Sequence, residues 1–144
     1  MDFEHDAIVI GPGPSRPEIS PLSMHVTSLD MPTLGICLGH QAIGLAKGMQ
    51  LIESPLGPVH GVPSKIIANG NGLLVKGEHT MTRYNSLVLS GNGDVEITAT
   101  DDTGTLPMEI RAGNLYGVQF HPESIGSPDG MSVLIEFLNR VAHC

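Results

Sequence analysis

The sequence predicts an α/β domain built on a mixed sheet. Apolar segments of strand length alternate with helical patterns in the first part of the chain, a run of short strands follows, and an amphipathic helix comes last. The segment Asp6–Ile10 is apolar and β-branched, which is typical of a strand buried in a parallel sheet. With 144 residues and 40% hydrophobic content, residues 1–144 are sufficient for one globular domain with its own core.

The first strand is followed by elements of mixed regularity. Gly11–Pro17 holds three prolines and two glycines, so it is expected to be a rigid, irregular loop. Glu18–Leu29 is expected to contain a short helix interrupted by Pro21, and Asp30–Ile36 returns to the sheet. The apolar spacing of Gly130–Val141 predicts an amphipathic helix that lies on the sheet. Further strands or short ordered runs are predicted at Gln50–Glu53, Val59–Ile67, Leu73–Val75, Arg83–Leu89, Val95–Thr100, Met108–Arg111 and Tyr116–Phe120.

The segment Gly35–Ala42 carries the strongest functional signal. It joins the end of a predicted strand to a helical pattern, so Cys37 is expected on a tight strand-to-helix turn. Gly35 and Gly39 are expected to supply the unusual backbone angles of that turn. The N-terminal end of a helix lowers the pKa of a neighbouring thiol and favours the nucleophilic thiolate. An isolated cysteine is more commonly a buried structural residue, but a second motif favours a functional one here.

That second motif is Phe120–Ser124, in which His121 and Glu123 flank a proline directly after an apolar strand. A cysteine, a distant histidine and a carboxylate are sufficient for covalent acyl transfer. The thiolate attacks a carbonyl carbon, the imidazolium protonates the leaving group, and water then hydrolyses the thioester. The sequence therefore predicts an enzyme with Cys37 as its nucleophile.

The composition excludes several other classes. The formal net charge is −8 with seven Lys and Arg, which argues against nucleic-acid binding because that requires clustered cations. No apolar run is long enough to cross a membrane, and residues 1–6 lack the pattern of a signal peptide. The two cysteines do not form a disulfide framework, and no spaced His/Cys cluster suggests a metal. We therefore expect a cytoplasmic protein with a free Cys37 thiol and no cofactor.

Three motifs together resemble the class I, triad-type glutamine amidotransferases. They are Gly11–Pro14, Gly35–Gln41 and Phe120–Ser124, and the resemblance covers nearly the whole chain. Within that family, Arg83–Leu87 and Val59–Gly61 are most similar to the glutaminase components of anthranilate synthase and aminodeoxychorismate synthase. The resemblance implies a mixed, mostly parallel central sheet flanked by helices, of flavodoxin type. It also implies that the family's N-terminal βαβ unit is missing, so that the domain is N-terminally incomplete.

The resemblance implies a role for each motif residue. Cys37 is the nucleophile, His121 the general base and acid, and Glu123 the residue that orients His121. The amides of Leu38 and Gly13 are expected to bind the oxyanion, the first from the geometry of the turn and the second from the family match. The residues that the resemblance places around the substrate are Gly13, Pro14, Ser15, Leu38, Gln41, Ser86 and Leu87.

The implied activity is hydrolysis of glutamine, with ammonia passed to a chorismate-using synthase that is a separate subunit or a fused domain. Two alternatives stay open. One is a glutaminase of another pathway, such as aminodeoxychorismate, phenazine-precursor or carbamoyl phosphate synthesis. The other is a truncated, non-catalytic remnant that binds a synthase.

Several residues depart from the family pattern or have simpler interpretations. Asn85 replaces a usual His, Val62 replaces a usual Lys, and Glu109 occupies a position where a small residue is common. Tyr84 is expected to line the pocket, and His40 to be a residue of the helix that follows Cys37. His60 is expected in a loop near the pocket or the partner. The remaining histidines are expected to be solvated: His5, His25, His79 and His143.

Overall fold

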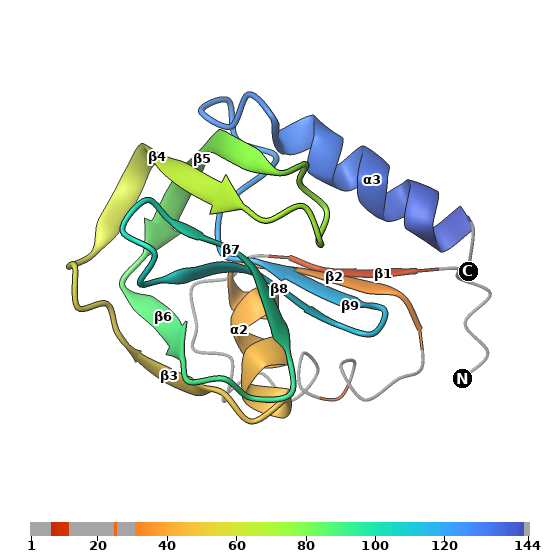
Figure 1. Ribbon diagram of the computed structural model, residues 1–144, viewed down its shortest axis with the longest axis horizontal. Coiled ribbons are helices and arrows are strands. Elements are labelled where there is room, and N and C mark those ends of the chain that lie inside the picture. The colour runs from red at the N-terminus through yellow and green to blue at the C-terminus, as the bar shows by residue number, and fades with distance from the viewer. Residues whose placement is uncertain (1–6, 12–24, 26–30, 143–144) are drawn as a thin grey trace.

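The computed structural model describes residues 7–11, 25 and 31–142 of the chain. Figure 1 shows the order of the elements in this part. The helices are α2 (Leu38–Ala46) and α3 (Gly130–Ala142). The strands are β1 (Ile8–Ile10), β2 (Thr33–Ile36), β3 (Gln50–Glu53), β4 (Val59–Ala68), β5 (Gly77–Asn85), β6 (Leu87–Ser90), β7 (Glu96–Asp101), β8 (Pro107–Ala112) and β9 (Leu115–Val118).

The main sheet has seven strands in the order β1-β2-β9-β8-β7-β4-β5, and β3 and β6 form a separate antiparallel pair. The ladders β1–β2 and β2–β9 are parallel, while the four ladders from β9 to β5 are antiparallel. The prediction of a mixed α/β sheet with flanking helices is confirmed. Its parallel part is confined to three strands, and these carry the site described below.

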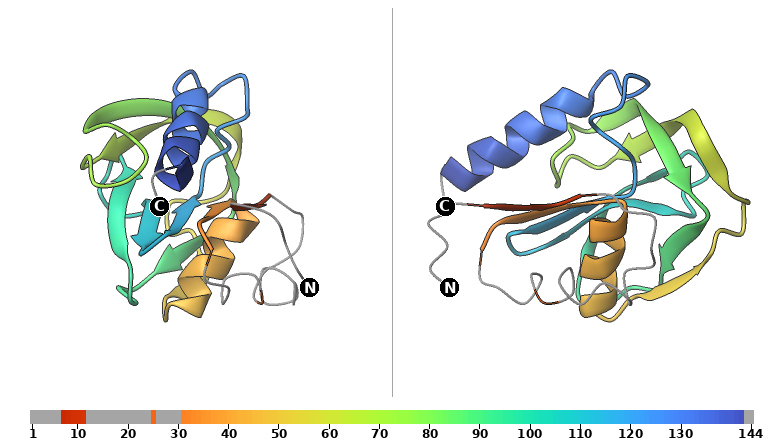
Figure 2. Two further views of the ribbon diagram at one scale, coloured as in Figure 1. Left: turned by 90° about the vertical axis from the view of Figure 1, so that its right-hand side faces the viewer. Right: turned by 180° about the vertical axis from the view of Figure 1, so that it is seen from behind.

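The two helices lie on opposite faces of the parallel strands, as Figures 1 and 2 show. Helix α3 buries Val133 and Phe137 in a core that includes Leu34 of β2 and Val118 of β9. On the other face, Ile43 of α2 packs into a second core. No helix in the described part of the chain is long and apolar enough to cross a membrane.

A pair of glycines allows α2 to lie close to the sheet. Gly35 of β2 is paired in register with Gly117 of β9. A Cβ atom on Gly117 would lie 2.9 Å from Nδ1 of His40, the buried histidine of α2. Side chains at these positions would push the helix away from the strands. His40 is therefore a packing residue of the helix, as predicted. Burial lowers its pKa to about 4, and the Gly117 backbone acts in the opposite direction.

Two predicted strands differ from the structure, and the helix predicted at Glu18–Leu29 falls outside the described residues apart from His25. The segment Arg83–Leu89 is divided at Ser86, because β5 pairs with β4 in the main sheet whereas β6 pairs with β3 in the other. Leu73–Val75 lies in the loop between β4 and β5 rather than in a strand. The backbone N–H of Leu73 donates to the Glu109 carboxylate, so it is not available to a strand neighbour.

Candidate active site

Cys37 lies where β2 ends and α2 begins. Its φ is 53° and its ψ is −96°, and it is the one non-glycine residue with a positive φ in the described part of the chain. Such a conformation is costly for a residue with a side chain and persists only when its surroundings enforce it. The Cys37 N–H donates to the Val118 carbonyl at 2.8 Å, which fixes the turn to the end of β9. The predicted strand-to-helix elbow is present.

Gly35 and Gly39, the glycines near Cys37, do not supply the unusual backbone angles that were predicted for them. Neither Gly35 nor Gly39 has a positive φ. A Cβ atom on Gly35 would lie 2.5 Å from the carbonyl of Gly39, and one on Gly39 would lie 2.5 Å from the Ile10 carbonyl oxygen. These glycines therefore permit close backbone approach, while the strained angle falls on the cysteine itself.

The Cys37 thiol is 9% exposed, and burial raises its pKa above the ordinary value of 9.0. The Leu38 amide and the Gln119 side chain act in the opposite direction, and the charge of Glu123 adds to the increase. The net direction corrects the sequence-based expectation that the helix end alone would favour the thiolate. Desolvation of a small anion outweighs the helix end when the sulfur is this enclosed. The enclosed environment therefore favours the neutral thiol over the thiolate.

His121 and Glu123 form a hydrogen-bonded pair. His121 Nδ1 lies 2.8 Å from Glu123 Oε1. The His121 N–H donates to the Thr82 carbonyl at 2.8 Å, which ties this segment to β5. His121 Nε2 is buried and has no hydrogen-bond partner among the described residues. The Nδ1 proton is therefore directed to the carboxylate, and Nε2 is left as the basic nitrogen.

Tyr84 of β5 contacts both the thiol and the imidazole. Its carbonyl oxygen lies 3.9 Å from Cys37 Sγ, and its ring packs edge-on against the His121 ring with centroids 5.1 Å apart. Tyr84 is half exposed, and its role in lining a pocket stays a prediction. The ends of β2 and β9 and the edge of β5 thus bring the two predicted motifs to one place.

The residues predicted around the substrate are only partly within the described chain. Gly13, Pro14 and Ser15 lie outside the described residues. Gln41 is buried on α2, and its Nε2 lies 3.3 Å from the Leu87 carbonyl and 3.2 Å from Gln119 Oε1. Ser86 is exposed at the β5–β6 junction. Gln41 is therefore hydrogen-bonded both to Leu87 and to Gln119.

Two polar residues were not anticipated by the sequence. Gln119 is fully buried, and its Nε2 lies 3.6 Å from Cys37 Sγ.

His79, expected to be solvated, is 8% exposed. Its ring nitrogens lie 2.7 Å from Asp129 Oδ2 and 2.8 Å from the Val75 carbonyl oxygen. The Asp129 contact spans 50 residues of sequence, so no local pattern reveals it. His60 is also misplaced by the prediction, since it lies exposed within β4 rather than in a loop.

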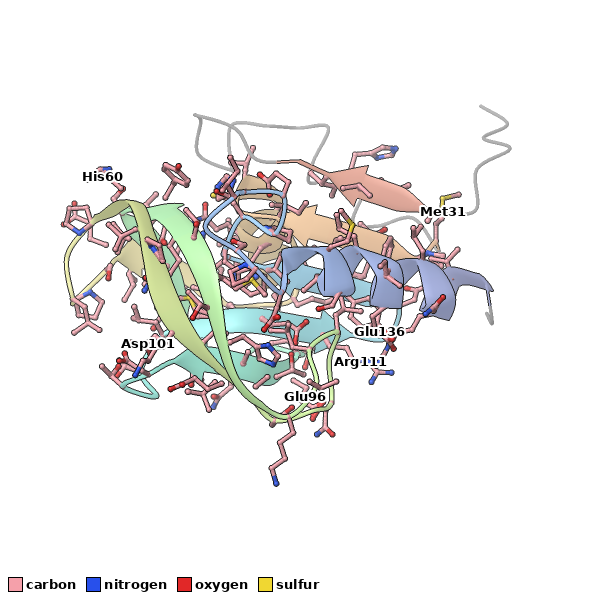
Figure 3. The ribbon with its side chains drawn as sticks, turned by 90° about the horizontal axis from the view of Figure 1, so that it is seen from above. Met31, His60, Glu96, Asp101, Arg111 and Glu136 are labelled. Carbon is pink, nitrogen blue, oxygen red and sulfur yellow. The ribbon has the colours of Figure 1, made fainter. Side chains whose placement is uncertain are left out.

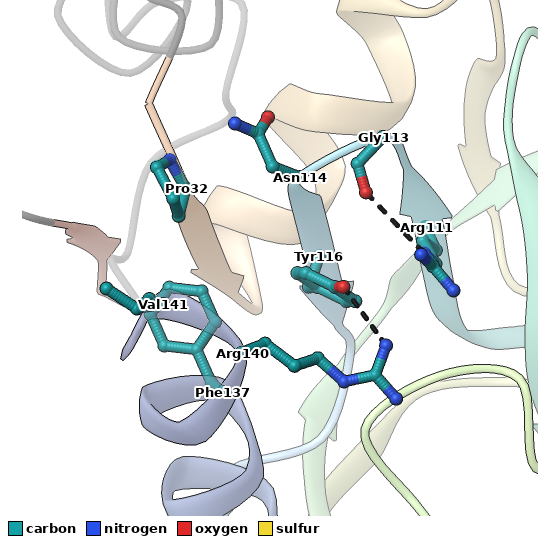
Figure 4. A pocket seen from close by; sticks show the side chains of 8 residues that line it. All are labelled: Pro32, Arg111, Gly113, Asn114, Tyr116, Phe137, Arg140 and Val141. Carbon is teal, nitrogen blue, oxygen red and sulfur yellow. Dashed lines mark hydrogen bonds between the residues drawn. The ribbon is translucent and has the colours of Figure 1, made fainter. Parts of the chain in front are cut away.

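The described residues contain no group of three or more His, Cys, Asp or Glu side chains that could hold a metal ion. A separate cavity of about 310 Å³ opens where β2 and β9 begin, the opposite end from Cys37 (Figure 4). Arg111 and Arg140 lie 5.6 and 5.5 Å from the centroid of the Tyr116 ring in this cavity. It is lined by Pro32, Arg111, Gly113, Asn114, Tyr116, Phe137, Arg140 and Val141, and so contains none of the predicted catalytic residues.

Known proteins are similar to this chain over nearly its whole length. The family model for glutamine amidotransferase class-I matches residues 1–141. The chain is 41% identical to the bifunctional protein TrpGD of Thermotoga maritima over 92% of this chain and 24% of that protein. It is 37% identical to anthranilate synthase component 2 of Cyanophora paradoxa and 38% identical to aminodeoxychorismate synthase component 2 of Escherichia coli, each over 92% of this chain.

The chain spans about a quarter of the bifunctional relative, 74% of the Cyanophora protein and 75% of the Escherichia coli protein. The crystal structure of a glutamine amidotransferase from Thermotoga maritima aligns with a TM-score of 0.71 at 19% identity, over 97% of this chain and 65% of that one. At that identity the alignment establishes a common fold.

Proposed function

Because this chain belongs to the class I glutamine amidotransferase family, we propose that it hydrolyses glutamine to glutamate and ammonia through Cys37, His121 and Glu123. The observation that carries the proposal is the state of the His121 ring. Its Nδ1 is bound to Glu123 at 2.8 Å, while its buried Nε2 is without a partner in the described part of the chain. A histidine held in this way is suited to take a proton from a neighbouring thiol.

The proposed reaction begins with transfer of the Cys37 thiol proton to His121 Nε2. The thiolate then forms a bond to the carboxamide carbon of glutamine, and the carbonyl oxygen becomes an oxyanion. The imidazolium gives its proton to the amide nitrogen, the C–N bond breaks, and ammonia leaves a thioester on Cys37. Water, deprotonated by His121, attacks the thioester and releases glutamate and the thiol. Glu123 stabilises the imidazolium in both halves of the cycle.

The oxyanion requires preorganised donors. The Leu38 amide lies at the N-terminal end of α2 beside the sulfur, where it already lowers the pKa of the thiol. This supports Leu38 as one oxyanion donor. We propose the amide of Gly13 as the second donor, and the support is its place in the family motif Gly11–Pro14.

Gln41, Ser86 and Leu87 are proposed to hold the amino-acid end of glutamine, with Pro14 and Ser15 completing the site. The Nε2 of Gln41 is occupied by Leu87 and Gln119. This leaves the acceptor Oε1 of Gln41, which is the appropriate partner for an α-ammonium group. Ser86 is exposed between β5 and β6, directly before Leu87, and supplies a hydroxyl there.

The ammonia is proposed to pass to a chorismate-using synthase, such as anthranilate synthase, as a separate subunit or a fused domain. The support is that the relatives include synthase components as well as a bifunctional chain. The proposal places this reaction in the cytoplasm, where a free catalytic thiol stays reduced.

The test is release of glutamate from glutamine by the purified chain, alone and with the large subunit of anthranilate or aminodeoxychorismate synthase. The wild-type chain is expected to turn over and to form a covalent adduct on Cys37 that mass spectrometry detects. Cys37→Ser should abolish both, because a serine hydroxyl is too weak a nucleophile for this base. The synthase paired with the variant should still accept free ammonia.

The chain offers a matched control in its other cysteine, since Cys144→Ser should retain activity. Wild-type turnover in Cys37→Ser would overturn the covalent mechanism. A wild-type chain that binds the synthase but never releases glutamate, with or without it, would favour a non-catalytic component.

A further inference from the structure

A row of hydrogen bonds extends from the backbone to the sulfur of Cys37. Gln41 Nε2 donates to the Leu87 carbonyl at 3.3 Å and to Gln119 Oε1 at 3.2 Å. Gln119 Nε2 donates in turn to Cys37 Sγ at 3.6 Å. Gln119 is fully buried and Gln41 is 6% exposed, so the row is shielded from solvent.

The orientation of both amides follows from the Leu87 carbonyl, which can only accept. The group of Gln41 that faces Leu87 must therefore be its NH₂. That NH₂ can only donate, so Gln119 must present its carbonyl oxygen to Gln41. The Gln119 NH₂ is then left to face the sulfur. Although an amide nitrogen and oxygen look alike in isolation, the backbone carbonyl at one end of the row decides the assignment at the other.

This assignment distinguishes the two protonation states of the sulfur. The neutral thiol can donate its proton to the Tyr84 carbonyl, which lies 3.9 Å from Sγ. The thiolate has no proton to give and benefits only from donors. Gln119 provides one from a buried, preoriented position, where a hydrogen bond to a charged group is stronger than the same bond in water.

We propose that Gln119 is a further catalytic residue, which donates a hydrogen bond to the Cys37 thiolate, and that Gln41 is a positioning residue, which holds the Gln119 amide in the donating orientation. The inference rests on the proposed function in taking Cys37 as the nucleophile. Gln119 therefore assists the first step, in which the thiol proton passes to His121 Nε2 and the charge appears on sulfur.

The need for such a donor follows from the burial of the sulfur. Burial raises the pKa of the Cys37 thiol, and the charge of Glu123 raises it further. The opposing contributions come from the Leu38 amide and from Gln119. Leu38 is also the proposed donor to the substrate oxyanion, whereas the Gln119 bond is directed at the sulfur alone. Gln119 is thus the donor that serves the thiolate specifically.

The experiment measures the thiol directly. The rate at which iodoacetamide alkylates Cys37 is followed from pH 7 to 12 in the full chain, with peptide mass spectrometry separating Cys37 from Cys144. Gln119→Met keeps the approximate shape of the side chain but removes the donor. Its midpoint should rise by about one pH unit, since a hydrogen bond to a charged group is worth about tenfold in the equilibrium. Gln41→Met should raise the midpoint by less, and Gln50→Met, a matched change at an exposed glutamine of β3, should leave it unchanged.

A structural role for Gln119 would alter stability without moving the midpoint. A cooperatively folded Gln119→Met chain with the wild-type midpoint would therefore overturn the proposal. Should Gln119→Met fail to fold, Gln119→Glu and Gln41→Met decide instead. The carboxylate of Gln119→Glu should raise the alkylation midpoint by more than Gln119→Met would. Wild-type midpoints in both Gln119→Glu and Gln41→Met would equally overturn the proposal. The readout needs no turnover, so an inactive wild-type chain would refute the proposed function while leaving this inference to be judged by the midpoints.

Discussion

Gly35 and Gly39 are in contact across the turn that carries Cys37: a Cβ atom added to Gly35 would lie 2.5 Å from both the carbonyl carbon and the carbonyl oxygen of Gly39. The atoms that such a Cβ atom would meet belong to the backbone, so the clash cannot be relieved by a side-chain movement. The positive φ of Cys37 is held by this contact and by the hydrogen bond from Cys37 N to Val118. The position of the sulfur therefore depends on two residues that have no side chain.

Gly35→Ala should displace α2 from β2 and disturb the Cys37 turn. We expect a loss of about 1–3 kcal/mol in the free energy of unfolding, together with loss of glutaminase turnover. Thermal melting and the glutamate assay check both. Gly11→Ala is the control for stability, because a Cβ atom there would meet nothing within 4 Å. Wild-type melting and turnover in Gly35→Ala would show that the turn can relax around the methyl group.

Glu123→Gln should lower turnover by roughly 10²-fold or more, because the imidazolium of His121 loses its anionic partner at 2.8 Å. The same change removes a charge that raises the pKa of the Cys37 thiol, so the alkylation midpoint should fall. A variant with lower turnover but a lower alkylation midpoint of Cys37 would show that Glu123 orients His121. Unfolding of the site would not lower that midpoint in this way. Glu78→Gln, an exposed partner of Lys65, is the control. Unchanged turnover in Glu123→Gln would exclude Glu123 from the mechanism.

Glu109→Gln should reduce the dependence of stability on pH. Burial raises the pKa of Glu109, and hydrogen bonds from Thr98 and Leu73 only partly oppose it. The folded state therefore keeps a proton that the unfolded state has lost, and its stability falls as the pH rises from the ordinary value of 4.5 through the folded pKa. Glutamine can accept from Leu73 and donate to Thr98 without a charge.

The measurement for Glu109 is urea unfolding at pH 5 and pH 7. The stability of Glu109→Gln relative to wild type should be greater at pH 7 than at pH 5. Glu53→Gln, at an exposed position of β3, should show no such difference. A Glu109→Gln chain with the full wild-type pH dependence would assign that dependence to other groups.

Asp101→Ala should destabilise the turn between β7 and β8, which Figure 3 shows at the labelled Asp101. Asp101 Oδ1 accepts from the amides of Thr105 and Leu106 at 3.0 and 2.8 Å, and Oδ2 accepts from the Thr103 hydroxyl. We expect a loss of ~1–3 kcal/mol. Burial opposes the charge of Asp101, but these hydrogen bonds outweigh it and lower the pKa.

The pH dependence from Asp101 has the opposite sign to that from Glu109. Its contribution is complete above the ordinary value of 3.8 and is lost as the pH falls through the lower folded pKa. The destabilisation caused by Asp101→Ala should therefore shrink in acid, and unfolding curves at pH 3 and pH 7 measure this. Asp102→Ala, at the exposed neighbouring position, is the control. A constant difference between the two pH values would contradict the assignment.

The sequence was informative where local spacing determines structure. The elbow at Cys37, the β8–β9 hairpin and α3 follow from glycines, turn residues and apolar periodicity. The pairing of His121 with Glu123, which the family resemblance implied, joins residues two positions apart. These features depend on residues a few positions apart, so a single sequence contains them.

The sequence was uninformative where partners are distant. His79 is held by Asp129, and Gln119 by Gln41, and neither pair has a local pattern. The break at Ser86 follows from the choice of a partner strand in another sheet. The direction of the Cys37 pKa depends on how completely the folded chain encloses the sulfur, which no motif encodes.

The pairing of β2 with β9 also determines when the thiol acquires its neighbours. Cys37 and Gln119 are 82 residues apart, so they meet only through a long-range closure that is slow compared with local folding. At about 5–20 residues per second, a ribosome needs about 4–16 s to add the intervening chain. During synthesis, Cys37 therefore spends several seconds as the thiol of an unfinished chain, open to oxidants before β9 and His121 exist to enclose it.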